Sequence, residues 1–405
     1  MDRKGLALVL SVFCTASVAG TAAALEVHFP DVNMETAVRE QLGIPVPAPI
    51  TDTDMLALTL LSGAATSYRN IVCLEGLEYA QNLEIAELRY NQIADVSPLS
   101  GLKSLVYLGL HQNRVANIGP LSGLSNLRRL NISENALADL TAVAGMASLQ
   151  YLEVQENKRI TDLAPLSGLT DISWIYAGDN QISNISALAG LTSLTQLKLQ
   201  CNQISDISAL AGLTLMYDLA LQVNHIEDVS PLLGMSNLMF LSLYDNDLTD
   251  ITPLGSLTRL RALSVGKNHI TDFSSLAGLA DLLLLNVEGT DSGDISVVAG
   301  LHRLEKLLAN NAAITDISAV AGLAQLEWLL LKDNQVTDIS PLAGLMNLGY
   351  VNLQGNPLNQ EAYEVYLPLI EANNPGMLLY YDPIPEPATL ALLAVGGLLL
   401  IRRRR

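Results

Sequence analysis

An asparagine recurs every 22 residues along most of this chain, and each one stands in the same frame of apolar residues. One step, from Asn157 to Asn180, is 23 residues, and the amide is replaced at Thr290 and Ala312. A fixed period of this size is typical of a solenoid, in which each structural unit contacts only its neighbours. We call the recurring residues the ladder asparagines: Asn91, Asn113, Asn135, Asn157, Asn180, Asn202, Asn224, Asn246, Asn268, Asn334 and Asn356.

The segment before each ladder asparagine has the pattern of a half-buried strand. In one repeat, Leu108 and Leu110 alternate with Tyr107, Gly109 and His111, so alternate side chains face outward. A buried asparagine can then satisfy the backbone groups that are exposed where the chain leaves the strand. We predict an α/β solenoid with a curved parallel β-sheet of about 13 strands, from residues 83–88 to residues 348–353.

The second half of each repeat reads as a short turn on the convex side. The segment Asp228-Val229-Ser230-Pro231-Leu232 is typical: the aspartate caps a helical turn, and proline stands where no N–H is needed. A repeat of 22 residues leaves room for a 3₁₀ turn but not for a full helix. The alternative for the aspartates is a row of metal ligands. The predicted caps are Asp95, Asp139, Asp206, Asp250, Asp316 and Asp338.

Helical segments flank the repeats and are predicted to cover the apolar ends of the stack. Asp31 can cap a helix that runs to about Leu42, and a second helix is expected from residue 51 or 52 to about Leu61. After Asn359, a helix is expected over residues 360–372. The predicted organisation is a cap with a half repeat (25–80), the repeats (81–358) and a second cap (359–382).

Both ends of the chain read as targeting signals. Arg3 and Lys4 precede an apolar run and three small residues, Ala22 to Ala24, which is the pattern of a secretory signal peptide over residues 1–24. At the other end, Pro385-Glu386-Pro387 precedes an apolar run over residues 388–401. As a helix, that run would be roughly 21 Å long, short for a membrane span. Four arginines close the chain: Arg402, Arg403, Arg404 and Arg405.

The repeat frame resembles the internalin-type bacterial leucine-rich repeats, which implies a recognition scaffold. Residues 383–405 resemble the PEP-CTERM sorting signal of Gram-negative bacteria. That resemblance implies export to the cell surface, outer membrane or extracellular matrix. It also implies processing by signal peptidase and an exosortase, with a transient membrane contact through the short transmembrane segment. An ordinary tail anchor is the alternative.

Charge and composition exclude several functions. The net charge is −19, and between Leu25 and Glu386 there are 16 basic and 40 acidic residues, which repel nucleic acid. This acidity fits a solubilising coat or a surface for calcium or a cationic partner. Cys73 and Cys201 are predicted to be free thiols. The histidines match no metal-ligand spacing, and there is no phosphate loop or nucleophile elbow. We therefore expect no catalytic, cofactor or metal site.

The best candidate for a binding site is the outward side of the sheet. Six positions before each ladder position, six of 13 residues are aromatic. Exposed aromatic side chains bury a large area at low entropic cost, as a protein- or glycan-binding surface needs. The alternative is that the rings only shield the sheet by stacking on one another. The candidate partner-binding residues are Tyr107, Arg129, Tyr151, Trp174, Tyr176, Phe240, Tyr244, Trp328 and Tyr350.

The sequence is compatible with two functions. The first is a non-enzymatic, exported recognition scaffold that binds a protein or polysaccharide through its concave aromatic face. The second is a structural component of an extracellular matrix or biofilm without a specific ligand. The missing amides at Thr290 and Ala312 also predict a locally weak zone near residues 288–314.

Overall fold

The structure is a computed structural model that describes residues 24–63 and 66–383. Nearly all of the predicted signal peptide and of the predicted sorting segment, including its motif residues and its apolar run, lies outside these residues.

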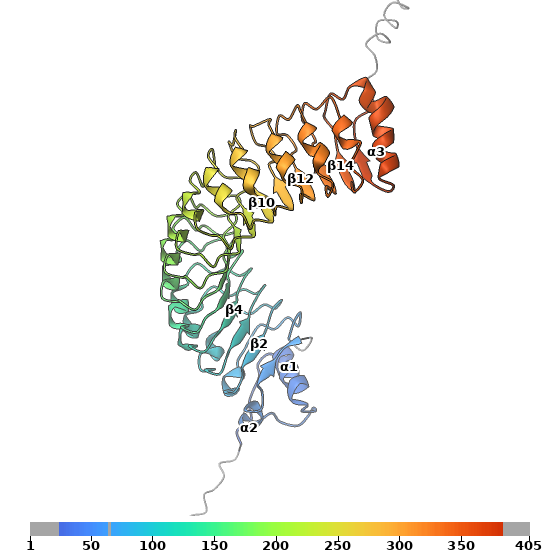
Figure 1. Cartoon of the computed structure of the whole chain (residues 1–405). Helices are drawn as coiled ribbons and strands as arrows, with labels where there is room; N and C mark the ends of the chain where they lie inside the picture. The colour runs from blue at the N-terminus through green and yellow to red at the C-terminus, as the bar shows by residue number, and fades with distance from the viewer. Residues whose placement is uncertain (1–23, 64–65, 384–405) are drawn as a thin grey trace, which may run out of the picture.

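Fifteen short strands form one parallel sheet, and each strand pairs with those before and after it in the sequence. The molecule is an arc, with the strands along its concave side and short helical turns along its convex side (Figure 1). The strands are β1 (Leu60–Leu61), β2 (Ile85–Glu87), β3 (Tyr107–Gly109), β4 (Arg129–Asn131), β5 (Tyr151–Glu153), β6 (Trp174–Tyr176), β7 (Gln196–Lys198), β8 (Asp218–Ala220), β9 (Phe240–Ser242), β10 (Ala262–Ser264), β11 (Leu284–Asn286), β12 (Lys306–Leu308), β13 (Trp328–Leu330), β14 (Tyr350–Asn352) and β15 (Leu378–Tyr380).

The 13 predicted strands are confirmed as β2 to β14, and β1 and β15 are additional strands contributed by the flanking segments. The predicted 3₁₀ turns are also confirmed. They are η2 (Leu77–Tyr79), η3 (Ser97–Leu99), η4 (Gly119–Gly123), η5 (Thr141–Gly145), η6 (Ala164–Leu166), η7 (Ser186–Leu188), η8 (Ser208–Leu210), η9 (Ser230–Leu232), η10 (Thr252–Ser256), η11 (Ser274–Gly278), η12 (Ser296–Gly300), η13 (Ser318–Gly322) and η14 (Ser340–Leu342).

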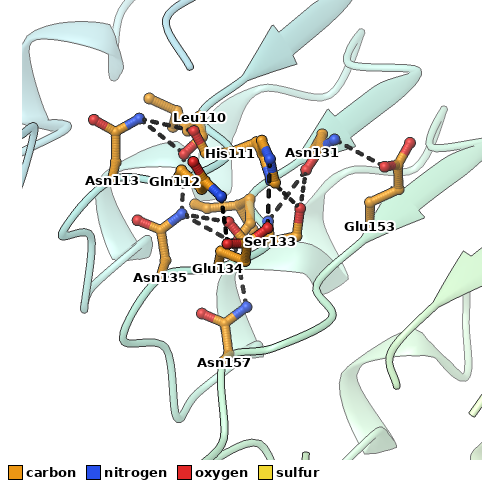
Figure 2. Close-up of polar contacts among 11 residues, drawn as sticks. Leu110, His111, Gln112, Asn113, Asn131, Ser133, Glu134, Asn135, Glu153 and Asn157 are labelled. Atoms are coloured by element: carbon orange, nitrogen blue, oxygen red, sulfur yellow. Dashed lines mark hydrogen bonds and ion pairs between the residues drawn. The ribbon is translucent and has the colours of Figure 1, made fainter. Parts of the chain in front are cut away.

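Each ladder asparagine joins the main chain of two consecutive repeats. The Nδ2 of Asn202 donates to the carbonyls of Leu199 (3.0 Å) in its own repeat and Ala177 (3.1 Å) in the preceding one. Its Oδ1 accepts the N–H of Ile182 at 2.9 Å. Figure 2 shows the same arrangement on successive turns of the solenoid, with the amides directed at main-chain groups rather than at one another. The amides therefore hold the repeats together through the backbone.

A left-handed residue turns each ladder asparagine inward. Strict strand alternation would point Asn246 outward, because Leu243 faces the core and lies three positions earlier. The intervening Asp245 has a φ of 58° and interrupts that alternation, so Asn246 is only 5% exposed. The residue before every ladder position has positive φ, including Val223 at 58°, although β-branched side chains rarely adopt this conformation.

The ladder hydrogen bonds differ at the 23-residue step and at the two positions that lack an asparagine. After the 23-residue step, the buried Oδ1 of Asn180 accepts no hydrogen bond from the part of the chain that is described. At the first gap, the hydroxyl of Thr290 donates to the carbonyl of Val287 (2.7 Å), within the same repeat. At the second gap, the N–H of Ala312 donates to Oδ1 of Asn334 at 3.0 Å.

The predicted aspartate caps are confirmed. Each of the six carboxylates accepts the N–H of the residue two positions later, where a 3₁₀ turn begins, as Asp95 does from Ser97 at 2.9 Å. Asn117 does the same for Gly119 at 2.8 Å, so an amide can replace the carboxylate. These contacts give the aspartates a structural role. In addition, the described residues include no group of three or more acidic, histidine or cysteine side chains arranged to hold a metal ion.

The N-terminal cap differs in part from the prediction. Helix α1 (Val32–Leu42) begins after Asp31, whose carboxylate accepts the N–H of Asn33 (2.8 Å) and Met34 (3.2 Å), as expected. The second helix, α2 (Asp52–Met55), has a capping box with Thr51 but does not reach Leu61, so that prediction is wrong. Leu61 is fully buried and pairs with Ala86, because the chain adds strand β1 to the edge of the sheet.

The C-terminal cap is helical, as predicted, and ends in a strand. A five-residue π-helix, η15 (Ala362–Tyr366), continues into α3 (Leu367–Asn373). The side chain of Asn359 accepts the N–H of Ala362 at 2.8 Å, at the start of this segment. The chain then adds β15 to the sheet beside β14.

Candidate functional site

The register of the sheet brings the predicted column together. The residues six positions before the ladder positions are direct partners in neighbouring strands, as in the series Tyr107, Arg129, Tyr151 and Trp174. We call this row the aromatic column; it comprises Ile85, Tyr107, Arg129, Tyr151, Trp174, Gln196, Asp218, Phe240, Ala262, Leu284, Lys306, Trp328 and Tyr350. It lies on the concave side of the arc (Figure 1).

The first aromatic cluster occupies strands β3 to β6 and consists of Tyr107, Arg129, Tyr151, Trp174 and Tyr176. The Arg129 guanidinium lies 4.8 Å from the ring centre of Tyr151 and 5.6 Å from that of Tyr107. Tyr151 contacts Trp174 edge to face at 4.9 Å, and Trp174 stacks with Tyr176 at 6.1 Å. Five predicted site residues thus form one continuous surface.

The second aromatic cluster lies at the C-terminal end of the sheet and includes one residue that the sequence reasoning missed. Trp328 is 42% exposed, stacks with Tyr350 at 5.5 Å, and lies 4.6 Å from the Nζ of Lys306. Tyr350 in turn contacts Tyr380 of β15 at 5.4 Å. Tyr380 precedes no ladder asparagine, so the 22-residue frame gave no signal for it.

Phe240 and Tyr244 lie between the two clusters and are not joined to either. Phe240 is 41% exposed, and Gln196 and Asp218 separate it from Trp174 in the column. The separation of Phe240 from Trp174 is three strands, or about 14 Å. Tyr244 has the Nζ of Lys267 5.2 Å from its ring centre. The nine predicted residues therefore form two clusters with two isolated aromatic residues between them.

Burial and hydrogen bonds perturb two titratable groups of the first cluster. Burial and a hydrogen bond from its hydroxyl to the carboxylate of Glu87 raise the pKa of Tyr107 well above its usual range. Burial also raises the pKa of Glu153, although Arg129 and His111 oppose this shift. The Nδ2 of Asn131 donates to the Glu153 carboxylate at 2.8 Å (Figure 2). Tyr107 and Glu153 are therefore partly shielded from solvent, and hydrogen bonds to neighbouring side chains hold them in place.

A hollow of about 450 Å³ lies on the rim, beyond the ends of the strands, and not over the aromatic column. His269 and Asp291 line it, and their side chains approach within 3.5 Å of each other. Lys267 and Glu288 also border it. Because its lining is charged and lacks aromatic residues, we place the candidate site on the concave face instead.

No helix within residues 24–63 and 66–383 is long and apolar enough to cross a membrane. The apolar run predicted near the C-terminus lies beyond these residues.

Comparisons with known proteins agree with the repeat and the sorting motif. A family model for leucine-rich repeats matches residues 103–145, 173–212 and 236–278, and a model for the PEP-CTERM protein-sorting motif matches residues 383–405. That motif implies export and sorting to the cell surface, as is typical of Gram-negative bacteria. A comparison with curated protein sequences gives no match.

Several solved structures share the fold. An internalin (InlF) from Listeria monocytogenes is 34% identical, with 80% of this chain and 96% of that chain covered at a TM-score of 0.78. A leucine-rich repeat protein of Leptospira interrogans is 20% identical, with coverage of 81% and 97% and a TM-score of 0.64. The ectodomain of an Arabidopsis thaliana receptor kinase, solved with Casparian strip integrity factor 2, is 23% identical, with coverage of 70% and 40% and a TM-score of 0.58.

The fold and these matches define a leucine-rich repeat scaffold, a class that is typically non-catalytic, and no catalytic family is evident among them. On its identity to the Listeria protein over nearly all of that chain, the protein belongs to the internalin family of leucine-rich repeat proteins.

Proposed function

We propose that this protein is a non-enzymatic recognition scaffold, exported to the cell surface, that binds a protein or polysaccharide along its concave face. The observation that supports this most is the aromatic column, which places two clusters of aromatic rings on neighbouring strands of the sheet. Trp328 and Phe240 are about two-fifths exposed, at 42% and 41%. Large aromatic side chains left accessible on a rigid surface are typical of binding sites.

The rigidity of the scaffold supports the same proposal. The first cluster stands on strands whose backbones are linked by the ladder amides, so its rings need little ordering when a ligand binds. A preformed site loses less conformational entropy on association than a flexible one. The Arabidopsis neighbour was solved in complex with Casparian strip integrity factor 2, which is consistent with this use of the fold.

The test replaces Tyr151 and Trp174 together with alanine. Purified full-length protein is applied to an array of immobilised neutral, anionic and cationic polysaccharides and of basic and acidic proteins. We expect at least one probe to bind saturably and to be lost with the double variant, while the melting temperature stays within a few degrees. The control is Tyr68→Ala, because Tyr68 is 71% exposed and lies outside the column. Retained binding together with a large loss of stability would refute the proposal.

A structural role in an extracellular matrix is the second candidate, and one observation favours it. Rings in both clusters stack on one another, as Trp328 does on Tyr350 at 5.5 Å, so part of their surface already shields the sheet. On this alternative no probe binds saturably, although the protein still accumulates outside the cell.

The sorting motif supports a further part of the proposal. We infer that signal peptidase and an exosortase process the chain, and that the protein reaches the outer membrane or extracellular matrix after transient membrane contact. Pro385, Glu386 and Pro387 would form the processing motif, and Arg402 to Arg405 would hold the end of the chain on the cytoplasmic side. Deletion of residues 385–405 should abolish surface retention in fractionated cells; unchanged retention would refute it.

A further inference from the structure

A row of glutamine side chains lies beside the first aromatic cluster. Two positions before the ladder asparagine, four adjacent repeats carry Gln155, Gly178, Gln200 and Gln222. The backbone links these repeats closely: the N–H of Asp179 donates to the carbonyl of Gln200 at 2.9 Å. Gly178 is two residues beyond Tyr176, or about 7 Å along the strand direction. The glutamine row and the aromatic rings therefore form parts of one surface.

These glutamines have unused acceptors. The side-chain oxygens of Gln155, Gln200 and Gln222 are buried, yet none accepts a hydrogen bond within the described residues. Buried polar atoms in folded proteins nearly always have a partner, so the three unpaired oxygens show that the hydrogen bonding of these glutamine amides is incomplete within the described residues. The outer two are three repeats apart, or about 14 Å.

Gly178 makes room for one of these side chains. A Cβ at this position would overlap the amide of Gln200, so only glycine lets that amide lie across the preceding repeat. The backbone at Gly178 is not in the left-handed region, so the lack of a side chain, rather than conformational freedom, is what matters. Gly178 thus leaves room for an uncharged amide on this surface.

Two pairs of opposite charges flank this surface. Lys198 forms an ion pair with Asp218, and Arg129 lies close enough to Glu153 to oppose its rise in pKa. Glu156 and Asp179 directly follow Gln155 and Gly178 and add negative charge beside the row. An anionic ligand would therefore be repelled here, whereas an uncharged ligand would not.

The rings supply the apolar half of the surface. Trp174 stacks with Tyr176 and meets Tyr151 edge to face. Aromatic faces pack well against the C–H faces of sugar rings, and hydroxyl groups both donate to and accept from amides. A chain of uncharged sugars offers apolar faces and hydroxyl donors at every unit.

We propose that a neutral polysaccharide binds across strands β5 to β8. Its sugar rings pack on Tyr151, Trp174 and Tyr176, and its hydroxyls form hydrogen bonds with the side-chain amides of Gln155, Gln200 and Gln222. This proposal rests on the proposed function and names the ligand class of the same face.

The test uses the full-length protein and three immobilised polysaccharides: laminarin (neutral), alginate (anionic) and chitosan (cationic), with polylysine as a basic polypeptide. Gln200 and Gln222 are replaced together with methionine, which keeps the side-chain size but removes the amide. The matched control is Gln354→Met, at the same position of a distant repeat. We expect saturable binding to laminarin, weakened about tenfold in the double variant and unchanged in the control, as the loss of two neutral hydrogen bonds implies.

The outcomes separate this inference from the proposed function. Binding only to alginate, chitosan or polylysine, or laminarin binding that the methionine variant retains, overturns the neutral polysaccharide. If those probes still require Tyr151 and Trp174, the proposed function stands. If saturable binding to every probe survives loss of both rings, or no probe binds saturably, both proposals fail.

Discussion

Replacing Asn202 with alanine should destabilise the protein more than the same replacement of Asn180. Both amides donate to main-chain carbonyls, Asn202 to Ala177 and Leu199, and Asn180 to Ala177 and Val154, at 3.0–3.1 Å. Only Asn202 also accepts a hydrogen bond, from the N–H of Ile182 at 2.9 Å. The buried Oδ1 of Asn180 has no donor among the described residues, so the pair isolates one interaction.

The magnitude follows from what each alanine leaves behind. The carbonyls of Ala177 and Leu199 each keep one donor when Asn202 is lost, because Asn180 and Asn224 also bond to them. The N–H of Ile182, by contrast, loses its side-chain acceptor in the protein interior, which costs about 1–3 kcal/mol. We therefore expect Asn202→Ala to lower the free energy of unfolding by about 1–3 kcal/mol more than Asn180→Ala does.

Urea unfolding followed by far-ultraviolet circular dichroism measures this difference, and amide hydrogen exchange at Ile182 locates it. Faster exchange at Ile182 in Asn202→Ala is the local counterpart of the global loss. Equal losses for the two variants, or a larger loss for Asn180→Ala, would refute the argument that the acceptor bond between repeats stabilises the stack.

Three further predictions concern the scaffold. Amides in residues 288–314 should exchange faster than those in residues 202–246, and Thr290→Asn should slow that exchange and add about 1 kcal/mol of stability; uniform protection in the parent protein would contradict this. Val223→Asn should raise the melting temperature, because a β-branched residue at a φ of 58° costs about 1 kcal/mol, and an unchanged value would argue against strain there. Hydrogen bonds from the Thr141 hydroxyl and N–H hold the pKa of Asp139 below its ordinary value. The stability that this carboxylate contributes is therefore present above the unfolded pKa near 3.8 and is lost as the pH falls through the folded value. The melting temperature should drop on acidification below about pH 4. Asp139→Asn, which keeps the cap as Asn117 does, should flatten that dependence in pH-resolved thermal scans, and an identical slope would count against it.

The repeat could be predicted closely because one residue marks it. Counting from the ladder asparagines located strands β2 to β14 and the aromatic column, since buried amides and alternating leucines both follow the 22-residue period. Strands β1 and β15 lie outside the repeats that carry a ladder position, so counting from the asparagines did not locate them. Leu61 looked helical from its neighbours, and only its pairing with Ala86 at the open edge of the sheet makes it a strand.

The left-handed conformation of the residue before each ladder asparagine also could not be predicted from the sequence. Asp245, Val223 and Gln112 share no side-chain chemistry, so a positive φ at these positions cannot be predicted from the residue types. The mutual stacking of Tyr151, Trp174 and Tyr176 was foreseen only as an alternative, because the sequence places rings in a row but does not set how they tilt. The unpaired glutamine oxygens required side-chain positions, which a strand pattern does not give.

Recognition through the concave face can be measured as binding of the full-length protein to the array of polysaccharides and proteins. We expect saturable binding to at least one member, lost when Tyr151 and Trp174 are replaced with alanine and kept in Tyr68→Ala. If no member binds saturably, or if the double variant binds as the parent does, the concave face is not the binding site.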